Sequence, residues 1–264
     1  MREIQPIGSY FPMNEEGFIL NPASWDKIDE DWKLVIREII TAYQTHIGAE
    51  LKAIYIRGSV AKGEAIKGFS DIDMFALVKS SFSKTVIRWQ TASFQNELEA
   101  YLQKKYPFIK AIECNLATYH DSFLTTNLAM VIQTQSLCVW GEDVSALIQK
   151  YRPNHQLMLN SKWLATDVED FKNLPTEQYT PEDGQAILKI LLRVGFELVM
   201  ERVGKFTNDL YLCYRDFSSY YPQYEADMRQ CLFWYLNPPS HKEELENVVY
   251  RIGAFLSKKV HTKA

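Results

Sequence analysis

Residues 54–78 read IYIRGSVAKGEAIKGFSDIDMFALV, and this stretch is the most informative about the fold. An apolar run leads into Gly58-Ser59, and the residues that follow can open a helix. A second apolar run begins at Asp71 and ends at Val78, so two strands flank a short connection. We therefore expect a strand, a glycine turn that opens a helix, and then a second strand.

The glycine turn has the chemistry of an anion-binding site. Backbone amides at a helix start point toward a ligand and favour negative charge. Gly58 permits close approach to the backbone, while the hydroxyl of Ser59 and the ammonium of Lys62 add polar contacts. We expect these three residues to bind phosphate groups.

Two carboxylates follow on the second strand. Asp71 and Asp73 are two residues apart, so their side chains project from the same face. Carboxylates in this position repel each other and raise each other's proton affinity. A divalent cation between them removes that cost, and Mg²⁺ is typically held by one or two carboxylates together with substrate phosphates. The pair therefore indicates a metal site, whereas an acidic residue at a surface turn explains only one of the two aspartates.

The runs GSVAKG at 58–63 and SDID at 70–73 resemble the signature of the DNA polymerase β-type nucleotidyltransferase superfamily. The resemblance is to its small bacterial branch, which holds aminoglycoside adenylyltransferases and minimal nucleotidyltransferases. It covers about residues 54–78. It implies that the Gly-Ser turn and Ser70 bind a nucleotide, that ATP is the nucleotide substrate, and that the two aspartates hold Mg²⁺.

The resemblance also implies a third carboxylate on a neighbouring strand, which completes the metal site or takes the proton from the attacking hydroxyl. Glu113 fits best, because it stands in the apolar segment FIKAIECNLAT at 108–118, where an isolated glutamate is unusual. An edge strand with one face in water would also explain it. Asp121 and Asp143 are the alternatives, although both resemble cap or turn residues.

Helices alternate with strands up to about residue 150, and long helical segments follow. This pattern predicts an α+β fold, with a small mixed β-sheet followed by an all-helical C-terminal domain. We expect a nucleotidyltransferase domain over residues 1–150, with an irregular arm at 1–24, and a helical substrate or acceptor domain over residues 151–264. The family fold is consistent with this layout.

The helical segment at 187–203 is apolar almost all round, which implies burial. Its charged residues are spaced by four and form one stripe: Lys189, Arg193, Glu197 and Glu201. Two interpretations stay open, a solvated stripe with ion pairs or a face turned to the nucleotide cleft. In the second, the basic end and Lys205 beyond the helix bind the nucleotide, and the glutamates meet the acceptor.

Composition narrows the expected partners. A formal net charge of −4 argues against extended electrostatic binding to nucleic acid, so nucleic acid is not an expected partner. The four cysteines are scattered without metal-binding spacing. The N-terminus lacks the layout of a signal peptide, and no apolar run approaches membrane-spanning length. We expect a cytoplasmic protein without a membrane partner.

The function that follows is in-line transfer of a nucleoside monophosphate, AMP from ATP, to a hydroxyl group. The acceptor stays open. A small molecule such as an aminoglycoside suits the acidic segment DVED at 167–170, and a protein hydroxyl is the antitoxin-like alternative. A regulatory nucleotide-binding module without catalysis is a rival of another class, and the intact set of Asp71, Asp73 and Glu113 argues against it.

Overall fold

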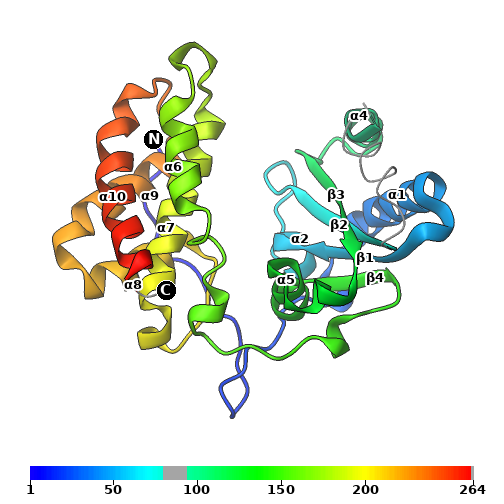
Figure 1. Cartoon of the computed structure of the whole chain (residues 1–264). Coiled ribbons are helices and arrows are strands. Elements are labelled where there is room, and N and C mark those ends of the chain that lie inside the picture. Colours follow the sequence, from blue (N-terminus) through cyan, green and yellow to red (C-terminus); the bar gives the residue numbers. More distant parts are fainter. Residues whose placement is uncertain (80–93, 263–264) are drawn as a thin grey trace. The chain divides into compact units, whose positions relative to one another are not determined.

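The computed structural model describes residues 1–79 and 94–262, and in it the chain divides into two compact units (Figure 1). One unit, Leu20–Lys150, contains the sheet. The other combines Met1–Ile19 with Tyr151–Ala264 and is helical. The first residues of the chain therefore pack with the helices, not with the sheet. Among the described residues, no helix is long and apolar enough to cross a membrane.

The sheet has four strands in the order β3-β2-β1-β4. Their bounds are β1 Leu51–Arg57, β2 Ile72–Lys79, β3 Ile112–Tyr119 and β4 Leu137–Gly141. β1 pairs antiparallel with both β2 and β4, whereas β2 pairs parallel with β3. This mixed sheet, followed by a helical C-terminal region, confirms the predicted α+β fold.

The described helices of the sheet unit are α1 Glu30–Ile47, α2 Gly58–Lys62, α4 Phe94–Lys105 and α5 Asn127–Gln135. Its short 3₁₀ turns are η1 Trp25–Lys27, η2 Gly48–Glu50, η3 Asp121–Thr125 and η4 Ser145–Leu147. α1 is amphipathic, and the side chain of Asp29 caps its start. Its buried residues pack with α4 residues against one face of the sheet, where the core includes Ile56, Met74 and Cys114. On the other face Tyr55, Phe75 and Leu77 are buried as well, and the charged residue Arg57 lies at the end of β1.

The helical unit is built around α7 Pro181–Val203, which contacts the other four long helices: α6 Leu164–Asn173, α8 Leu210–Tyr220, α9 Glu225–Leu236 and α10 Glu243–His261. The turn η5 His155–Leu157 precedes α6, η6 Thr176–Gln178 connects α6 to α7, and η7 Pro222–Tyr224 connects α8 to α9. A capping box between Thr180 and Asp183 starts α7, and Gly204 in the left-handed region ends it.

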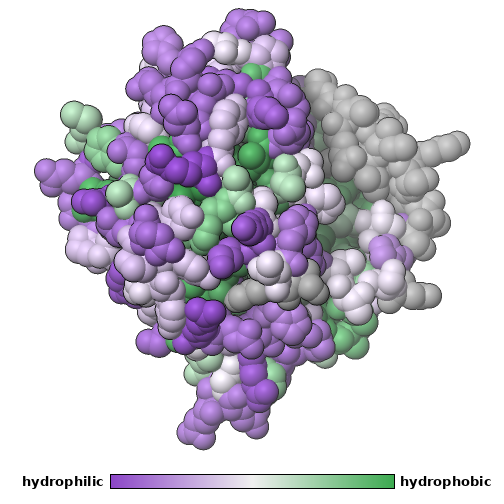
Figure 2. Space-filling model, turned by 60° about the vertical axis from the view of Figure 1, so that its left-hand side comes forward, coloured by the Kyte–Doolittle hydropathy of each residue, from purple (hydrophilic) through white to green (hydrophobic). Residues whose placement is uncertain are grey.

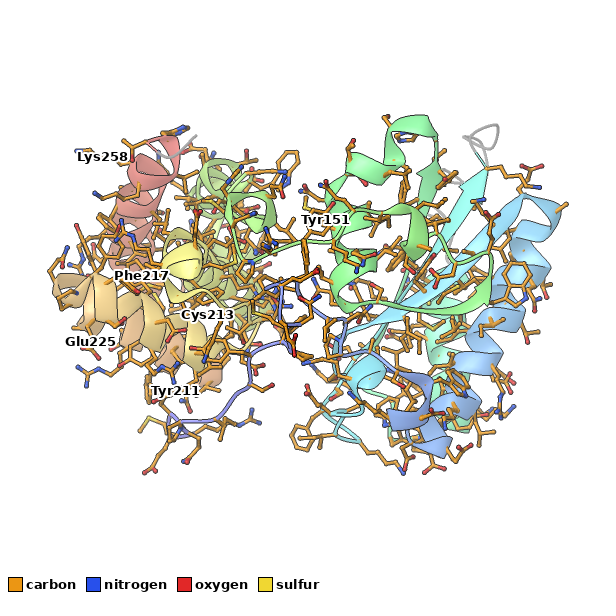
Figure 3. All side chains as sticks on the ribbon, turned by 90° about the horizontal axis from the view of Figure 1, so that it is seen from below. Tyr151, Tyr211, Cys213, Phe217, Glu225 and Lys258 are labelled. Atoms are coloured by element: carbon orange, nitrogen blue, oxygen red, sulfur yellow. The ribbon has the colours of Figure 1, made fainter. Side chains whose placement is uncertain are left out.

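The interior of the helical unit is mostly apolar, and its outer surface is mostly polar. Cys213 and Phe217 of α8 are fully buried in the bundle (Figure 3). On the face drawn in Figure 2, hydrophilic residues predominate and hydrophobic residues occur in small groups. This distribution fits helices whose apolar stripes are turned inward.

The N-terminal arm is bound to the segment around α8 by polar and aromatic contacts. The amide of Ser9 donates to Asp209 at 2.6 Å, and the amide of Phe11 donates to the carbonyl of Phe206 at 2.8 Å. The Phe11 and Phe206 rings meet edge to face. The arm is thus an ordered part of the helical unit.

Candidate active site

Three charged side chains lie in one row across the sheet. Arg57, the last residue of β1, stands opposite Asp73 on β2, and Asp73 stands opposite Glu113 on β3. Cross-strand partners project from the same face, so the three side chains share one surface. The adjacent row, which includes Ile56 and Met74, projects to the other face and joins the core with α1.

The Gly58 turn is pressed against the carboxyl group of Asp73. Gly58 has φ +77°, in the left-handed region that favours glycine, and a Cβ atom at this position would overlap Asp73 Oδ2. The backbone of the turn and the carboxyl group therefore occupy their positions only because residue 58 is glycine. This close approach explains why the Gly-Ser turn and the aspartate occur together.

The charges in the row are only partly balanced. Burial, followed by the neighbouring carboxyl of Glu113, raises the pKa of Asp73 to about 6, although the positive charge of Arg57 acts in the opposite direction. Arg57 Nη2 lies 3.8 Å from Asp73 Oδ1 and 3.3 Å from Glu113 Oε2. The two carboxylates, beside a single guanidinium, form a site suited to further positive charge.

Asp71 is not a cross-strand neighbour in the row that contains Asp73 and Glu113. It lies one residue before β2, and its Oδ1 atom is 3.4 Å from Lys110 Nζ. Glu113 Oε1 instead accepts a hydrogen bond of 2.6 Å from Asn115 Nδ2. Within the described residues, no group of three or more His, Cys, Asp and Glu side chains is arranged to hold a metal ion. The structure thus brings Asp73 and Glu113 together and pairs Asp71 with a lysine.

The position of Glu113 combines the two interpretations of its sequence. β3 is an edge strand, and its residues alternate between buried and exposed over Ile112–Asn115. Glu113 therefore has one face toward water and is at the same time the neighbour of Asp73. Asp143 accepts from the hydroxyl of Tyr55 at 3.1 Å and from the amide of Ser145, which is a turn contact. The side chain of Asp121 lies outside the described part of the structure.

The remaining residues of the predicted phosphate site form local contacts. Ser59 lies in α2, a helix of five residues, and its carbonyl accepts from the amide of Glu64 at 2.9 Å. Lys62 Nζ lies 2.5 Å from a carboxylate oxygen of the same Glu64. The hydroxyl of Ser70 accepts from the amide of Ile66 at 2.9 Å and so closes the loop between α2 and β2.

The charged stripe of α7 is divided among different environments. Glu197 is buried and accepts four hydrogen bonds, two each from Asn160 and Ser161, at 2.5–2.9 Å. Burial raises its pKa, and these hydrogen bonds oppose the rise. The expectation that Glu197 meets the acceptor is therefore wrong, because its carboxylate is occupied within the helical unit. Glu201, one turn further along, is exposed, and Lys189 is half-buried.

The two basic candidates of the helical unit differ in their surroundings. Arg193 lines a small cavity with Asn160, Glu197, Thr207 and Asn208. Its Nε atom is buried and has no hydrogen-bond partner among the described residues. Lys205 is exposed beyond the end of α7, and its ammonium lies 4.8 Å from the centre of the Tyr10 ring of the N-terminal arm.

The Gly58 turn and the charged row lie within a segment that matches a known family. Residues 36–123 match the model of the nucleotidyltransferase domain. These residues form a nucleotidyltransferase domain of the polymerase β type. In this family the domain transfers nucleotidyl groups. The match agrees with the resemblance carried by residues 58–63 and 70–73.

A solved structure has the same fold as the chain. It is the crystal structure of spectinomycin adenyltransferase AAD(9) from Enterococcus faecialis with ATP and spectinomycin. The TM-score is 0.53 at 12% sequence identity, and the match covers 87% of this chain and 99% of that chain. At this identity the likeness shows the fold alone. No curated protein sequence gives a significant match.

The nucleotidyltransferase domain contains one residue whose role sequence reasoning did not identify. Arg57 contacts both carboxylates of the row, yet in the sequence it is only a basic residue that follows an apolar strand. The available signal was a charged residue placed directly before the glycine turn. Its partners depend on the pairing of three strands, which the sequence around it does not specify.

The raised pKa of Asp73 predicts a pH-dependent effect of Asp73→Asn on stability. In the folded protein this pKa lies above its usual range, so the fold loses stability as the pH rises through about 6 and the carboxyl ionises. Without added divalent cations, the variant should be more stable than the parent by about 1–3 kcal/mol above pH ~7. The difference should vanish near pH ~4, as measured by chemical denaturation. Asp26→Asn is the control, because Asp26 is exposed. An equal effect of Asp73→Asn on stability at both pH values would contradict this prediction.

The close approach at Gly58 predicts that Gly58→Ala is more harmful than its φ angle alone requires. Gly68 has φ +79°, but a Cβ atom there meets no atom of the described residues within 4 Å. Both alanine variants carry backbone strain, and only Gly58→Ala adds overlap with Asp73, at a further cost of about 1–3 kcal/mol. Denaturant unfolding should measure this difference. In an Asp73→Ala background the two glycine variants should become equal, and a persistent difference would show that another contact is responsible.

Proposed function

We propose that the protein transfers AMP from ATP to a hydroxyl group of a small cationic acceptor, such as an aminoglycoside. The observation that carries this proposal is the adjacency of Asp73 and Glu113 beside the Gly58 turn in a nucleotidyltransferase domain. The solved structure of the same fold, with ATP and spectinomycin bound, supports the choice of nucleotide and acceptor class.

The carboxylates of Asp73 and Glu113, with Asp71, are the residues that would hold Mg²⁺. Their chemistry fits this ion, because carboxylate oxygens are its preferred protein ligands, and one or two carboxylates suffice when substrate phosphates complete the coordination. Burial, and after it the neighbouring carboxyl of Glu113, raises the pKa of Asp73, and a bound cation would stabilise the ionised form. When bound, Mg²⁺ would neutralise charge on the phosphates.

The residues of the chain then have separate tasks. Gly58 lets the turn approach the carboxyl of Asp73, and Gly58, Ser59, Lys62 and Ser70 are proposed to bind the phosphates. The acceptor oxygen attacks the α-phosphorus, a new P–O bond forms, and the bond to the bridging oxygen breaks so that pyrophosphate leaves. Glu113 receives the proton of the attacking hydroxyl, a task that its partly exposed carboxylate can perform.

Arg193 and Lys205 are also proposed to bind the nucleotide. Arg193 is the stronger candidate, because a buried guanidinium nitrogen without a partner is costly and an anion would satisfy it. Lys205 is exposed, so its ammonium is accessible to a phosphate.

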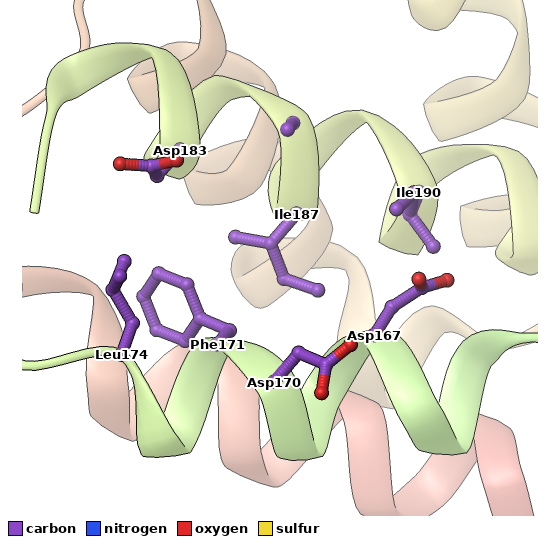
Figure 4. A pocket seen from close by; sticks show the side chains of 8 residues that line it. Asp167, Asp170, Phe171, Leu174, Asp183, Ile187 and Ile190 are labelled. Carbon is purple, nitrogen blue, oxygen red and sulfur yellow. The ribbon is translucent and has the colours of Figure 1, made fainter. Parts of the chain in front are cut away.

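The acceptor is assigned to a pocket between α6 and α7, with a volume of about 260 Å³ (Figure 4). Asp167, Asp170 and Asp183 line it together with apolar side chains, among them Phe171 and Ile187. Burial and the nearby Asp170 raise the pKa of Asp167. Concentrated negative charge beside an apolar surface favours a compact ligand with amino groups.

Transfer should depend on Asp73 and Glu113. Asp73→Asn and Glu113→Gln are expected to lower the rate of AMP transfer at least ~100-fold, since each removes a charge that the reaction needs. The measurement is incubation with labelled ATP, Mg²⁺ and a panel of aminoglycosides, read by the mass shift of the acceptor. Asp26→Asn serves as the control. A near-normal rate in either site variant would refute the assigned role.

The α6–α7 pocket predicts an acceptor-specific defect. Asp170→Asn should raise the KM for a cationic acceptor about tenfold, equivalent to ~1.4 kcal/mol, while the KM for ATP stays unchanged. Glu169→Gln is the matched control, because Glu169 is the preceding residue on α6 and contacts Lys172 and Asn173 instead of lining the pocket. Equal effects of the two variants would place the acceptor elsewhere.

A further inference from the structure

Arg57 is a built-in cation at the carboxylates that are proposed to hold the metal. Its guanidinium extends from β1 past the neighbouring strand, so that Nη2 is 3.8 Å from Asp73 Oδ1 and 3.3 Å from Glu113 Oε2. One side chain therefore contacts both members of the pair. An arginine stays protonated under physiological conditions, so this contact is a permanent source of positive charge.

The long side chain of Arg57 has room to move away from the two carboxylates. The carboxyl group of Asp73 is backed by the Gly58 turn, where even a single added carbon would overlap it. Glu113 is oriented by the amide group of Asn115. The Arg57 side chain is 39% exposed, against 28% for Asp73 and 49% for Glu113, and its ion pairs are longer than a tight bidentate contact. A second cation at these carboxylates would repel the guanidinium, and the guanidinium could then move into solvent.

We propose that Arg57 is an internal counter-ion, which competes with a divalent cation for Asp73 and Glu113 and transfers to the phosphates of the incoming nucleotide. This inference rests on the proposed function. Its consequence is that cation and nucleotide bind together more favourably than either binds alone. By thermodynamic linkage, the nucleotide then raises the affinity for the cation by the same factor as the cation raises the affinity for the nucleotide.

The test uses the full chain, with Mn²⁺ as the probe, and measures free Mn²⁺ by electron paramagnetic resonance in the absence of nucleotide. Arg57→Gln removes the competing charge and should bind Mn²⁺ about tenfold more tightly than the parent. The same variant should bind ATP more weakly when no divalent cation is present. Opposite changes in the two affinities are specific to a counter-ion, because a general structural defect would weaken both.

Two further variants sharpen the result. Arg57→Lys keeps the charge and should retain parental Mn²⁺ affinity, whereas Arg57→Met keeps the apolar stem and should behave like Arg57→Gln. Arg251→Gln, which removes an exposed arginine paired with Asp227 in the helical unit, is the matched control and should change neither affinity. Circular dichroism establishes that each variant is folded.

The outcomes separate this inference from the function on which it rests. If the folded Arg57→Gln and Arg57→Met proteins bind Mn²⁺ no more tightly than the parent, the counter-ion role is overturned, whatever the transfer assay gives. The role is also overturned if ATP affinity without metal is unchanged in these variants. Failure of the proposed function would appear instead as normal AMP transfer in Asp73→Asn or Glu113→Gln.

Discussion

The site depends on the register in which β2 pairs with its two neighbours. That register sets Asp73 between Arg57 and Glu113, with a positive charge on one side and a negative charge on the other. Because side chains alternate between the faces of a strand, a slip of one residue would turn Asp73 into the core and bring Met74 to the site. The apolar residues that pack under α1 therefore hold the register, and with it the charged row.

The surroundings of the charged row explain why Asp73 has a raised pKa and interacts strongly with cations. Two residues further along the same face, Tyr55 and Phe75 stack with their ring centres 5.4 Å apart. The hydroxyl of Tyr55 is held by Asp143. This aromatic pair keeps water from one side of Asp73, while the Gly58 turn covers another. Reduced hydration raises the pKa of Asp73 and strengthens its interaction with any cation.

The sequence predicts those parts of the fold and site that rest on local signals. Apolar runs before and after the glycine turn indicate β1 and β2, and an apolar segment with one acidic residue singles out Glu113. The partners of Arg57 and the pairing of Asp71 with Lys110 were not predictable in this way. Both depend on which strands become neighbours, and that is decided by packing between segments far apart in the chain. The roles assigned to these residues in metal and nucleotide binding stay predictions.

The stripe on α7 illustrates a second limit of sequence patterns, and it has a geometric origin. A spacing of four residues advances about 400° around a helix, so each step drifts by about 40°, and Lys189 and Glu201 end about 120° apart. The stripe cannot form one surface, which is why Glu197 is enclosed by Asn160 and Ser161 while Glu201 is exposed. Arg193 lies between the half-buried Lys189 and the enclosed Glu197. Its buried Nε atom, without a partner among the described residues, carries a cost that Glu197 has avoided through its four hydrogen bonds.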